Sequence, residues 1–197
     1  MHNEVNPDAS AASTPGRTLS AELTDRILNE TWVTFQQRGY SSVDIESVAR
    51  EVGCGKTSIY RRWATKQELL AAAFMHNSEF GEDPDTGNLL DDLMAFIMVN
   101  VRNQQGRPFH VILRIDEPEI RDTLWEKFYV PRQELGFAIL RRGIERGELD
   151  ARANLADIID LVSGLVLFRN AIRHSITTEE ELRRILPGIL ANPPLEG

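Results

Sequence analysis

Residues 53–66 combine cationic and hydroxyl side chains in a pattern that suits contact with nucleic acid. This stretch holds four Lys or Arg residues and no Asp or Glu. Side chains such as those of Thr57 and Ser58 can meet base edges or the thymine methyl, whereas Lys, Arg and Tyr side chains hold phosphates. The pattern therefore predicts binding of double-stranded DNA through Lys56, Thr57, Ser58, Tyr60, Arg61, Arg62 and Lys66.

Two short amphipathic helices must position these side chains. The first is predicted from Asp44, an N-cap residue, to about Glu51, because its apolar residues recur at i, i+3, i+4 and i+7. Gly53 then tolerates the positive φ of a tight reversal. The second helix is predicted from after Gly55 to about Trp63, with its apolar residues facing inward. A helix of this kind fits the major groove of B-DNA.

The flanking sequence predicts one helix on each side of this pair. Apolar residues repeat every four positions along residues 20–38, and Gly39 ends that helix as a C′ residue. Thr65 and Glu68 form a capping box, so the next helix is predicted to start at Lys66. Lys66 then lies at a positive helix end, which suits a phosphate anchor.

In order and spacing, residues 20–75 resemble the TetR family of bacterial transcriptional regulators. The matching residues are Ile27, Leu28, Phe35, Gly39, Tyr40, Ile45, Val48, Ala49, Gly53, Lys56, Ile59, Tyr60, Trp63, Lys66 and Leu69. The resemblance implies a homodimer that binds a palindromic operator, as a repressor, and is released by an inducer. Asp44 stands where the family usually has Thr or Ser, and Gly55 stands where a Ser commonly caps the recognition helix. Both are acceptable N-caps, and both belong to the predicted DNA-binding residues.

The remaining sequence predicts an all-α protein with about nine helices, because no β-alternating segment of useful length occurs. Three parts are expected: a disordered arm at 1–18, a helix-turn-helix domain at 19–66 with its motif at 44–63, and a ligand-binding and dimerisation domain at 67–192. Further helices are predicted at 89–105, 108–115, 118–147 with a kink at Pro131, 154–174 and 178–190.

The last two predicted helices carry more apolar surface than one bundle needs, and surplus apolar surface usually means a partner. The resemblance implies that they pair with their copies in a four-helix dimer interface. The predicted interface residues are Ile158, Leu161, Val162, Leu165, Phe168, Leu182, Ile185, Leu186 and Ile189.

Methionine and aromatic residues in the C-terminal part suit a pocket for a small apolar or aromatic molecule, since such side chains adapt to varied shapes. The predicted lining consists of Met94, Ile97, Met98, Val101, Phe109, Leu113, Trp125, Phe128, Tyr129, Leu140, Leu165 and Phe168, with Asn100, His110 and Arg169 as polar contacts. For each of them, an ordinary place in the core of the bundle is the alternative.

Charge is divided unevenly along the chain, whose net charge is −8. Residues 17–66 carry eight Lys or Arg against six Asp or Glu, whereas residues 67–197 carry 14 against 22. The positive charge is local, so the acidic total does not argue against DNA binding.

Other functional classes find little support. The four His residues are scattered without metal spacing, and no P-loop or G-x-S-x-G motif occurs, so we expect no enzyme activity, cofactor or metal site. One cysteine and no long apolar run predict a cytoplasmic protein without membrane contact. Two alternatives stay open: a regulator of the same fold controlled by a protein partner or by oxidation of Cys54, and a helical adaptor without specific DNA binding.

Overall fold

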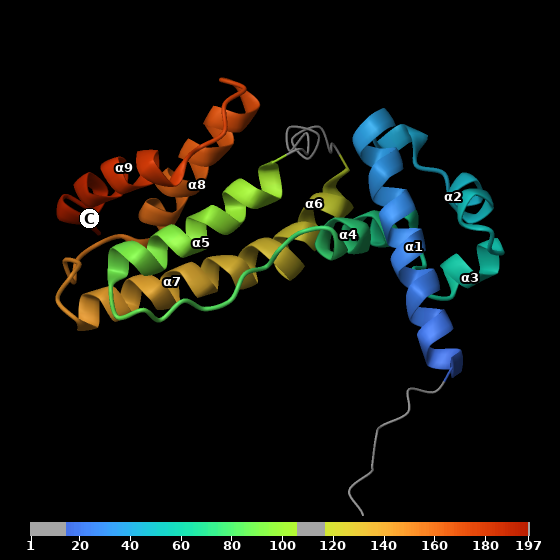
Figure 1. Ribbon diagram of the computed structural model, residues 1–197, viewed down its shortest axis with the longest axis horizontal. Helices are drawn as coiled ribbons and strands as arrows, with labels where there is room; N and C mark the ends of the chain where they lie inside the picture. Colours follow the sequence, from blue (N-terminus) through green and yellow to red (C-terminus); the bar gives the residue numbers. More distant parts are fainter. Residues whose placement is uncertain (1–14, 106–116, 197) are drawn as a thin grey trace, which may run out of the picture.

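The computed structural model describes residues 15–105 and 117–196. Its helices are α1 (Pro15–Arg38), α2 (Ile45–Val52), α3 (Lys56–Tyr60), α4 (Lys66–His76), α5 (Leu89–Gln104), α6 (Pro118–Leu124), α7 (Val130–Glu145), α8 (Leu155–Ala171) and α9 (Glu179–Ala191), with a 3₁₀ turn η1 (Tyr40–Ser42) and a π-helical turn η3 (Trp125–Tyr129). Helices α1 to α3 form one end of an elongated molecule, and α5, α7, α8 and α9 form the other (Figure 1). The predicted all-α class is confirmed: within the described ranges, β-pairing is limited to one isolated bridge.

Side-chain caps fix where several helices begin. The carboxylate of Asp44 accepts from the Ser47 N–H at 3.0 Å at the start of α2. At α9, Thr178 and Glu181 form both bonds of a capping box. Thr65 likewise accepts from the N–H of Glu68, the N3 residue of α4. The Glu68 carboxylate accepts from the N–H of Ala64 at 2.8 Å, and not from the N–H of Thr65 as in the predicted capping box.

Some predicted boundaries differ from the structure. Helix α1 begins at Pro15, so the last four residues of the predicted arm are helical. Helix α3 ends at Tyr60, three residues before its predicted end, and the chain continues into a turn. The helix predicted at 108–115 lies outside the described residues.

The predicted kink near Pro131 takes the form of a π-helical turn. One long helix was expected from 118 to 147, and the structure instead joins α6 to α7 through the wider turn η3. Proline has no N–H to donate to the carbonyl of Lys127, four residues earlier, so the regular bonding pattern fails just before Pro131. Such π turns are frequent at functional sites.

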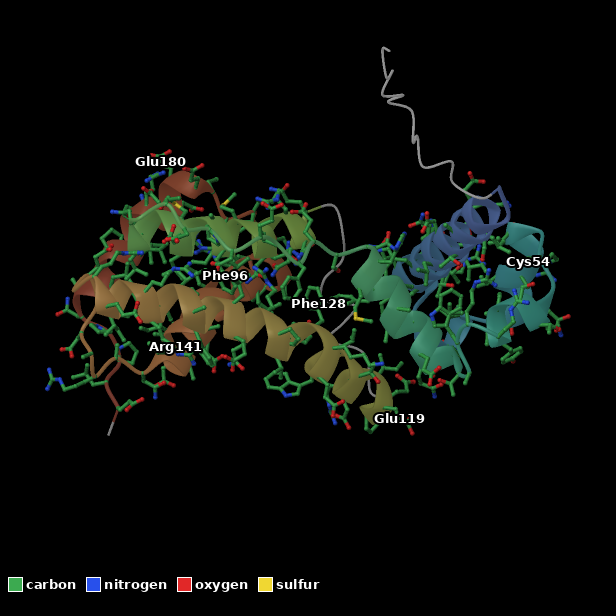
Figure 2. All side chains as sticks on the ribbon, turned by 90° about the horizontal axis from the view of Figure 1, so that it is seen from below. Cys54, Phe96, Glu119, Phe128, Arg141 and Glu180 are labelled. Atoms are coloured by element: carbon green, nitrogen blue, oxygen red, sulfur yellow. The ribbon has the colours of Figure 1, made fainter. Side chains whose placement is uncertain are left out.

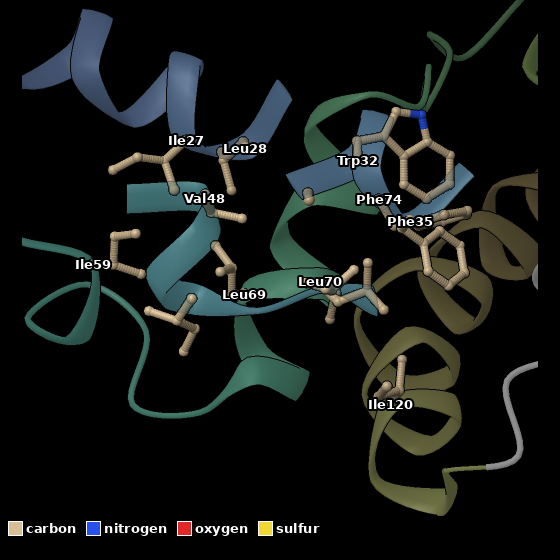
Figure 3. Packing of buried hydrophobic residues seen from close by; sticks show 14 of the residues in the cluster. Ile27, Leu28, Trp32, Phe35, Val48, Ile59, Leu69, Leu70, Phe74 and Ile120 are labelled. Atoms are coloured by element: carbon tan, nitrogen blue, oxygen red, sulfur yellow. The ribbon is translucent and has the colours of Figure 1, made fainter. Parts of the chain in front are cut away.

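Two apolar cores hold the molecule together. The first joins α1, α2, α3 and α4, and it also includes α6 through the buried Ile120 (Figure 3). The buried side chains of Leu124 and Phe128 join α6 and η3 to the same core. The second lies among α5, α7, α8 and α9. Because α4 and α6 pack in the first core, the DNA-binding end is not independent of the rest of the chain.

Candidate DNA-binding surface and ligand cavity

The exposed face of α3 is set by the apolar residue on its other side. Ile59 is 0% exposed in the first core, so Lys56, Thr57 and Tyr60 lie on the solvent side, where Tyr60 is 51% exposed. Gly53 directs the chain into α3, since its φ of 72° ends α2 in the left-handed region. The helix lies at the outer end of the molecule, with α1 between it and the body (Figure 1).

Lys56 carries its charge on this outer face but already has a partner. Its ammonium lies 2.7 Å from the carboxylate of Glu46 on α2, and the hydrogen bond to Glu46 raises the pKa of Lys56. Both side chains are more than half exposed, and ion pairs of this kind contribute little stability. A phosphate can therefore replace Glu46. Arg61 is exposed just past α3, and Ser58 is half-buried.

Arg62 does not point to solvent as predicted. Its Nε donates to the Thr24 hydroxyl at 3.0 Å, Nη1 donates to the Ser58 carbonyl at 2.6 Å, and Nη2 donates to the Ser20 hydroxyl at 3.0 Å. The guanidinium thereby ties the end of α3 to the first half of α1. These bonds engage all three nitrogens of the guanidinium, so we propose that Arg62 positions α3 and is not primarily a DNA contact.

Lys66 stands at the predicted helix start, as the first residue of α4. Its ammonium lies 3.9 Å from the centroid of the Tyr40 ring, an arrangement in which the ring face attracts the cation. The side chain is half-buried, and desolvation lowers its pKa. The aromatic ring therefore holds this cation in place at the end of α4 where the helix dipole is positive.

Asp44 and Gly55 both act at helix starts. The Asp44 carboxylate accepts from the N–H and the hydroxyl of Ser47, and these bonds lower its pKa. Gly55 is the N-cap of α3 with an ordinary φ of −78°, and a Cβ there would meet open space. Cys54, between the two helices, is half-buried against the first core.

A cavity of about 420 Å³ lies among α4, α5, η3, α7 and α8. Five of its lining residues are aromatic. Figure 2 shows Phe96 between α5 and α7, and Phe128 where η3 approaches α4. The lining residues are Phe74, Phe96, Asn100, Asn103, Gln104, Trp125, Phe128, Tyr129, Arg132, Gln133, Ile159, Asp160, Ser163, Gly164 and Leu167.

Four of the predicted lining residues, Asn100, Trp125, Phe128 and Tyr129, lie in this wall. Four others were misplaced: Met94, Ile97, Val101 and Leu140 are at most 3% exposed and fill the second core. Helix α5 is apolar on most of its circumference, so periodicity does not show which side meets a cavity. Phe109, His110 and Leu113 lie outside the described residues.

The remaining predicted pocket residues also lie elsewhere. Met98 packs half-buried against the second core, while Leu165 and Phe168 face a shallow hollow on the outer side of α8. Arg169 is 8% exposed and forms an ion pair with Glu181 at 2.9 Å, which joins α8 to α9. The sequence spacing placed these side chains on the correct helices but on the wrong faces.

Arg132 is the main feature of the cavity that sequence reasoning missed. It is 4% exposed, and its Nε donates to the Asn100 side chain at 2.9 Å. Nη1 donates to the carbonyl of Phe80, and Nη2 to that of Phe96 at 2.6 Å. Burial lowers the pKa of Arg132 to about 10. A basic residue one position after a proline in a helix gave no signal of this burial, because its partners come from distant parts of the chain.

The outer side of α8 exposes a row of large apolar side chains. Leu161 is 51% exposed, Phe168 is 53% exposed and Ile172 is 64% exposed. The shallow hollow on this side is bounded by Leu161, Leu165, Phe168 and the C-terminal Pro194. These residues, with the half-buried Ile185 and Ile189 of α9, remain available for the predicted interface.

Four residues predicted for the interface are not available to a partner. Ile158, Val162, Leu182 and Leu186 are all 0% exposed and belong to the second core. Both helices are apolar on two sides, and the inward side packs against α5 and α7 within the chain. Only the outward side of each helix can pair with another subunit.

The fold and the exposed α3 define a helix-turn-helix protein that binds DNA. Two family models match the chain: "Bacterial regulatory proteins, tetR family" over residues 27–73, and "Tetracyclin repressor-like, C-terminal domain" over residues 83–187. The second match alone spans more than half of the sequence. The chain therefore belongs to the TetR family of transcriptional regulators.

Similar proteins agree with this assignment. The DNA-binding transcriptional repressor TetR of Mycobacteroides abscessus is 30% identical over 138 residues, which cover 66% of this chain and 73% of that protein. An uncharacterized HTH-type transcriptional regulator of Mycobacterium tuberculosis is 29% identical over 161 residues, 79% of this chain and 80% of that protein. The crystal structure of a TetR-family regulator from Rhodococcus sp. shares the fold, with a TM-score of 0.66 at 18% identity, over 87% of this chain and 97% of that one.

Neither a membrane-spanning helix nor a metal site occurs among the described residues. None of the helices combines the length and apolar character needed to cross a membrane. Among the side chains that the structure describes, no group of three His, Cys, Asp or Glu residues is arranged to hold a metal ion.

Proposed function

We propose that the chain represses transcription as a homodimer and releases a palindromic operator when a small aromatic molecule occupies the cavity. One observation carries the proposal: the cavity and the DNA-binding end share helix α4. Phe74 of α4 lines the cavity and is also 3% exposed in the first core, beside α1. A ligand that moves α4 therefore acts on the helices that present the DNA-contacting face.

A chain of aromatic contacts supports this route. The rings of Phe128 and Phe74 pack edge to face with centroids 5.0 Å apart, and Phe74 packs edge to face on Trp32 of α1 at 5.7 Å. Closely packed side chains shift together and do not deform independently. Ligand binding against Phe128 would change the packing of Trp32 and hence the placement of α1 and α3. By linkage, ligand and DNA then weaken each other's binding by the same factor.

The exposed row on α8 supports the proposed homodimer. A contiguous apolar row of this kind marks an interaction surface. A two-fold pairing of α8 and α9 would present two α3 helices together, and groove-reading helices of such dimers lie about 34 Å apart, one turn of B-DNA. The proposed DNA contacts in each subunit are Lys56, Thr57, Ser58, Tyr60, Arg61 and Lys66, with Asp44 and Gly55 at the helix starts.

The coupling between cavity and DNA can be measured directly. An operator is first selected from a random DNA library, and aromatic ligands are titrated by calorimetry into free and operator-bound protein. We expect at least one ligand to bind the free protein more tightly than the operator-bound protein. Phe74→Leu should reduce the ratio of the two affinities, whereas the control Met75→Leu, at a half-buried position on α4 outside the cavity wall, should keep it. A ligand that binds both forms equally would show that the cavity is not the switch.

A further inference from the structure

Arg132 leaves a positive charge at the cavity wall without a negative partner. Its three hydrogen bonds go to neutral acceptors, on Asn100, Phe80 and Phe96. Within the described ranges, the ion pairs do not include Arg132, and the nearby Glu79 is paired with Arg102 at 2.8 Å. Burying a charge without a counter-ion is costly, and it normally requires a partner.

The guanidinium also has donors to spare. Arginine carries five N–H groups, and three of them are used within the chain. The other two are one each on Nη1 and Nη2. These are the atoms that meet the two oxygens of a carboxylate in a bidentate pair.

A second polar atom on the same wall is also unsatisfied. The side-chain Oε1 of Gln104 is buried without a hydrogen-bond partner, and Gln104 is 6% exposed. Buried polar atoms are nearly always paired, and an amide oxygen can only accept, so Gln104 would take a hydroxyl or N–H donor of a ligand and not its carboxylate. The wall therefore offers unused donors on Arg132 and an unused acceptor on Gln104.

We propose that the cavity binds an aromatic carboxylate, with the carboxylate against Arg132 and the ring among Phe74, Phe96 and Phe128. This inference rests on the proposed ligand-binding role of the cavity and names the class of ligand. The volume of about 420 Å³ is large enough for a fused-ring acid. Asp160, exposed on the α8 side of the wall, repels the carboxylate and so favours the orientation toward Arg132.

The charge of Arg132 separates this proposal from the two other classes that an aromatic wall accepts. Aromatic rings also bind organic cations, but a cation here would face an unneutralised guanidinium. A neutral aromatic molecule would fill the apolar wall and leave the charge uncompensated. Charge-assisted hydrogen bonds are roughly twice as strong as neutral ones, so the anion is the preferred form.

The test uses three probes of nearly equal shape on the full chain: 2-naphthoate, 2-naphthamide and 2-naphthylmethylammonium. Calorimetry on the DNA-free protein is expected to give at least about tenfold tighter binding of the carboxylate than of the amide, and weakest binding of the ammonium. Equal affinities, preference for the amide or the ammonium, or no binding of 2-naphthoate at millimolar concentration would each overturn the proposal.

Variants separate a binding role of Arg132 from a purely structural one. Arg132→Gln should abolish the preference for the carboxylate over the amide, and Arg132→Lys should restore part of it. Loss of a structural contact alone would weaken all three probes together and leave the ratio unchanged, which would count against the proposal. Arg102→Gln is the matched control: it removes a nearby exposed cation that pairs with Glu79, and the preference should stay. If a variant is destabilised, the affinities of the three probes for the wild-type protein still test the proposal.

The same titrations distinguish this inference from the proposed function. If 2-naphthoate binds selectively but operator affinity does not change, the ligand class is correct and the cavity is not the switch. If the probes bind without selectivity and one of them still releases the operator, the switch is correct and the proposed ligand class is wrong.

Discussion

Replacement of Arg62 by Met should weaken DNA binding because it loosens the attachment of α3 to α1, and not because it removes a contact with DNA. The side chain donates hydrogen bonds to Thr24 and Ser20, which tie it to α1, and to the carbonyl of Ser58 within α3. At about 0.5–1.5 kcal/mol each, and with the site half exposed, their loss should lower the free energy of unfolding by roughly 2 kcal/mol. Chemical denaturation followed by circular dichroism measures this change.

The salt dependence of DNA binding then separates the two roles that Arg62 can have. A residue that only positions α3 should weaken operator binding without changing the slope of log K against log salt. A phosphate contact would reduce that slope by about 0.9 per subunit. Lys56→Met is the matched control, since its exposed ion pair with Glu46 adds little stability and its charge faces outward. A reduced slope with unchanged stability in Arg62→Met would refute the assignment.

Three further changes test other parts of the account. Gly55→Ser should stabilise the protein by about a few tenths of a kcal/mol and strengthen DNA binding, because Ser caps α3 better and a Cβ meets open space; lower affinity in a fluorescence anisotropy titration would contradict this. Leu161→Glu, on a 51% exposed side chain, should leave the helical content intact and give monomers in sedimentation; a variant that remains dimeric would remove this side of α8 from the interface. Gly143→Ala should cost about 1–3 kcal/mol of unfolding free energy, because its Cβ would lie 2.5 Å from Leu89 Cδ2; an unchanged denaturation midpoint would show that the Leu89 side chain moves aside without cost.

The parts of the fold that could be predicted depend on local chemistry. The cap at Asp44 and the turn at Gly53 follow from neighbours within a few residues, and both have the expected geometry. The same holds for Thr65, which caps the helix that begins at Lys66. These signals are short-range, so they can be identified from the sequence without knowing which helices pack together.

The candidate sites were harder, because their side chains meet across long stretches of chain. Arg62 bonds to a residue 38 positions earlier, and Arg132 bonds to one 52 positions earlier. On α5, apolar periodicity predicts a buried helix but does not separate Met94, which fills the core, from Phe96, which lines the cavity. Tertiary packing decides which face of a helix lines the cavity and which face packs in the core. The spacing of apolar residues along the helix does not distinguish the two faces.

In the proposed dimer, two α3 helices bind DNA together, one turn of the double helix apart. Selection of binding sites from a random DNA library, followed by hydroxyl-radical footprinting of the selected sequence, tests it most directly. The account predicts an inverted repeat whose half-sites are centred about 10 base pairs apart, or a multiple of that spacing, with two protected segments on the same face of the DNA. Recovery of a single unrepeated site, or of no enriched sequence at all, would contradict it.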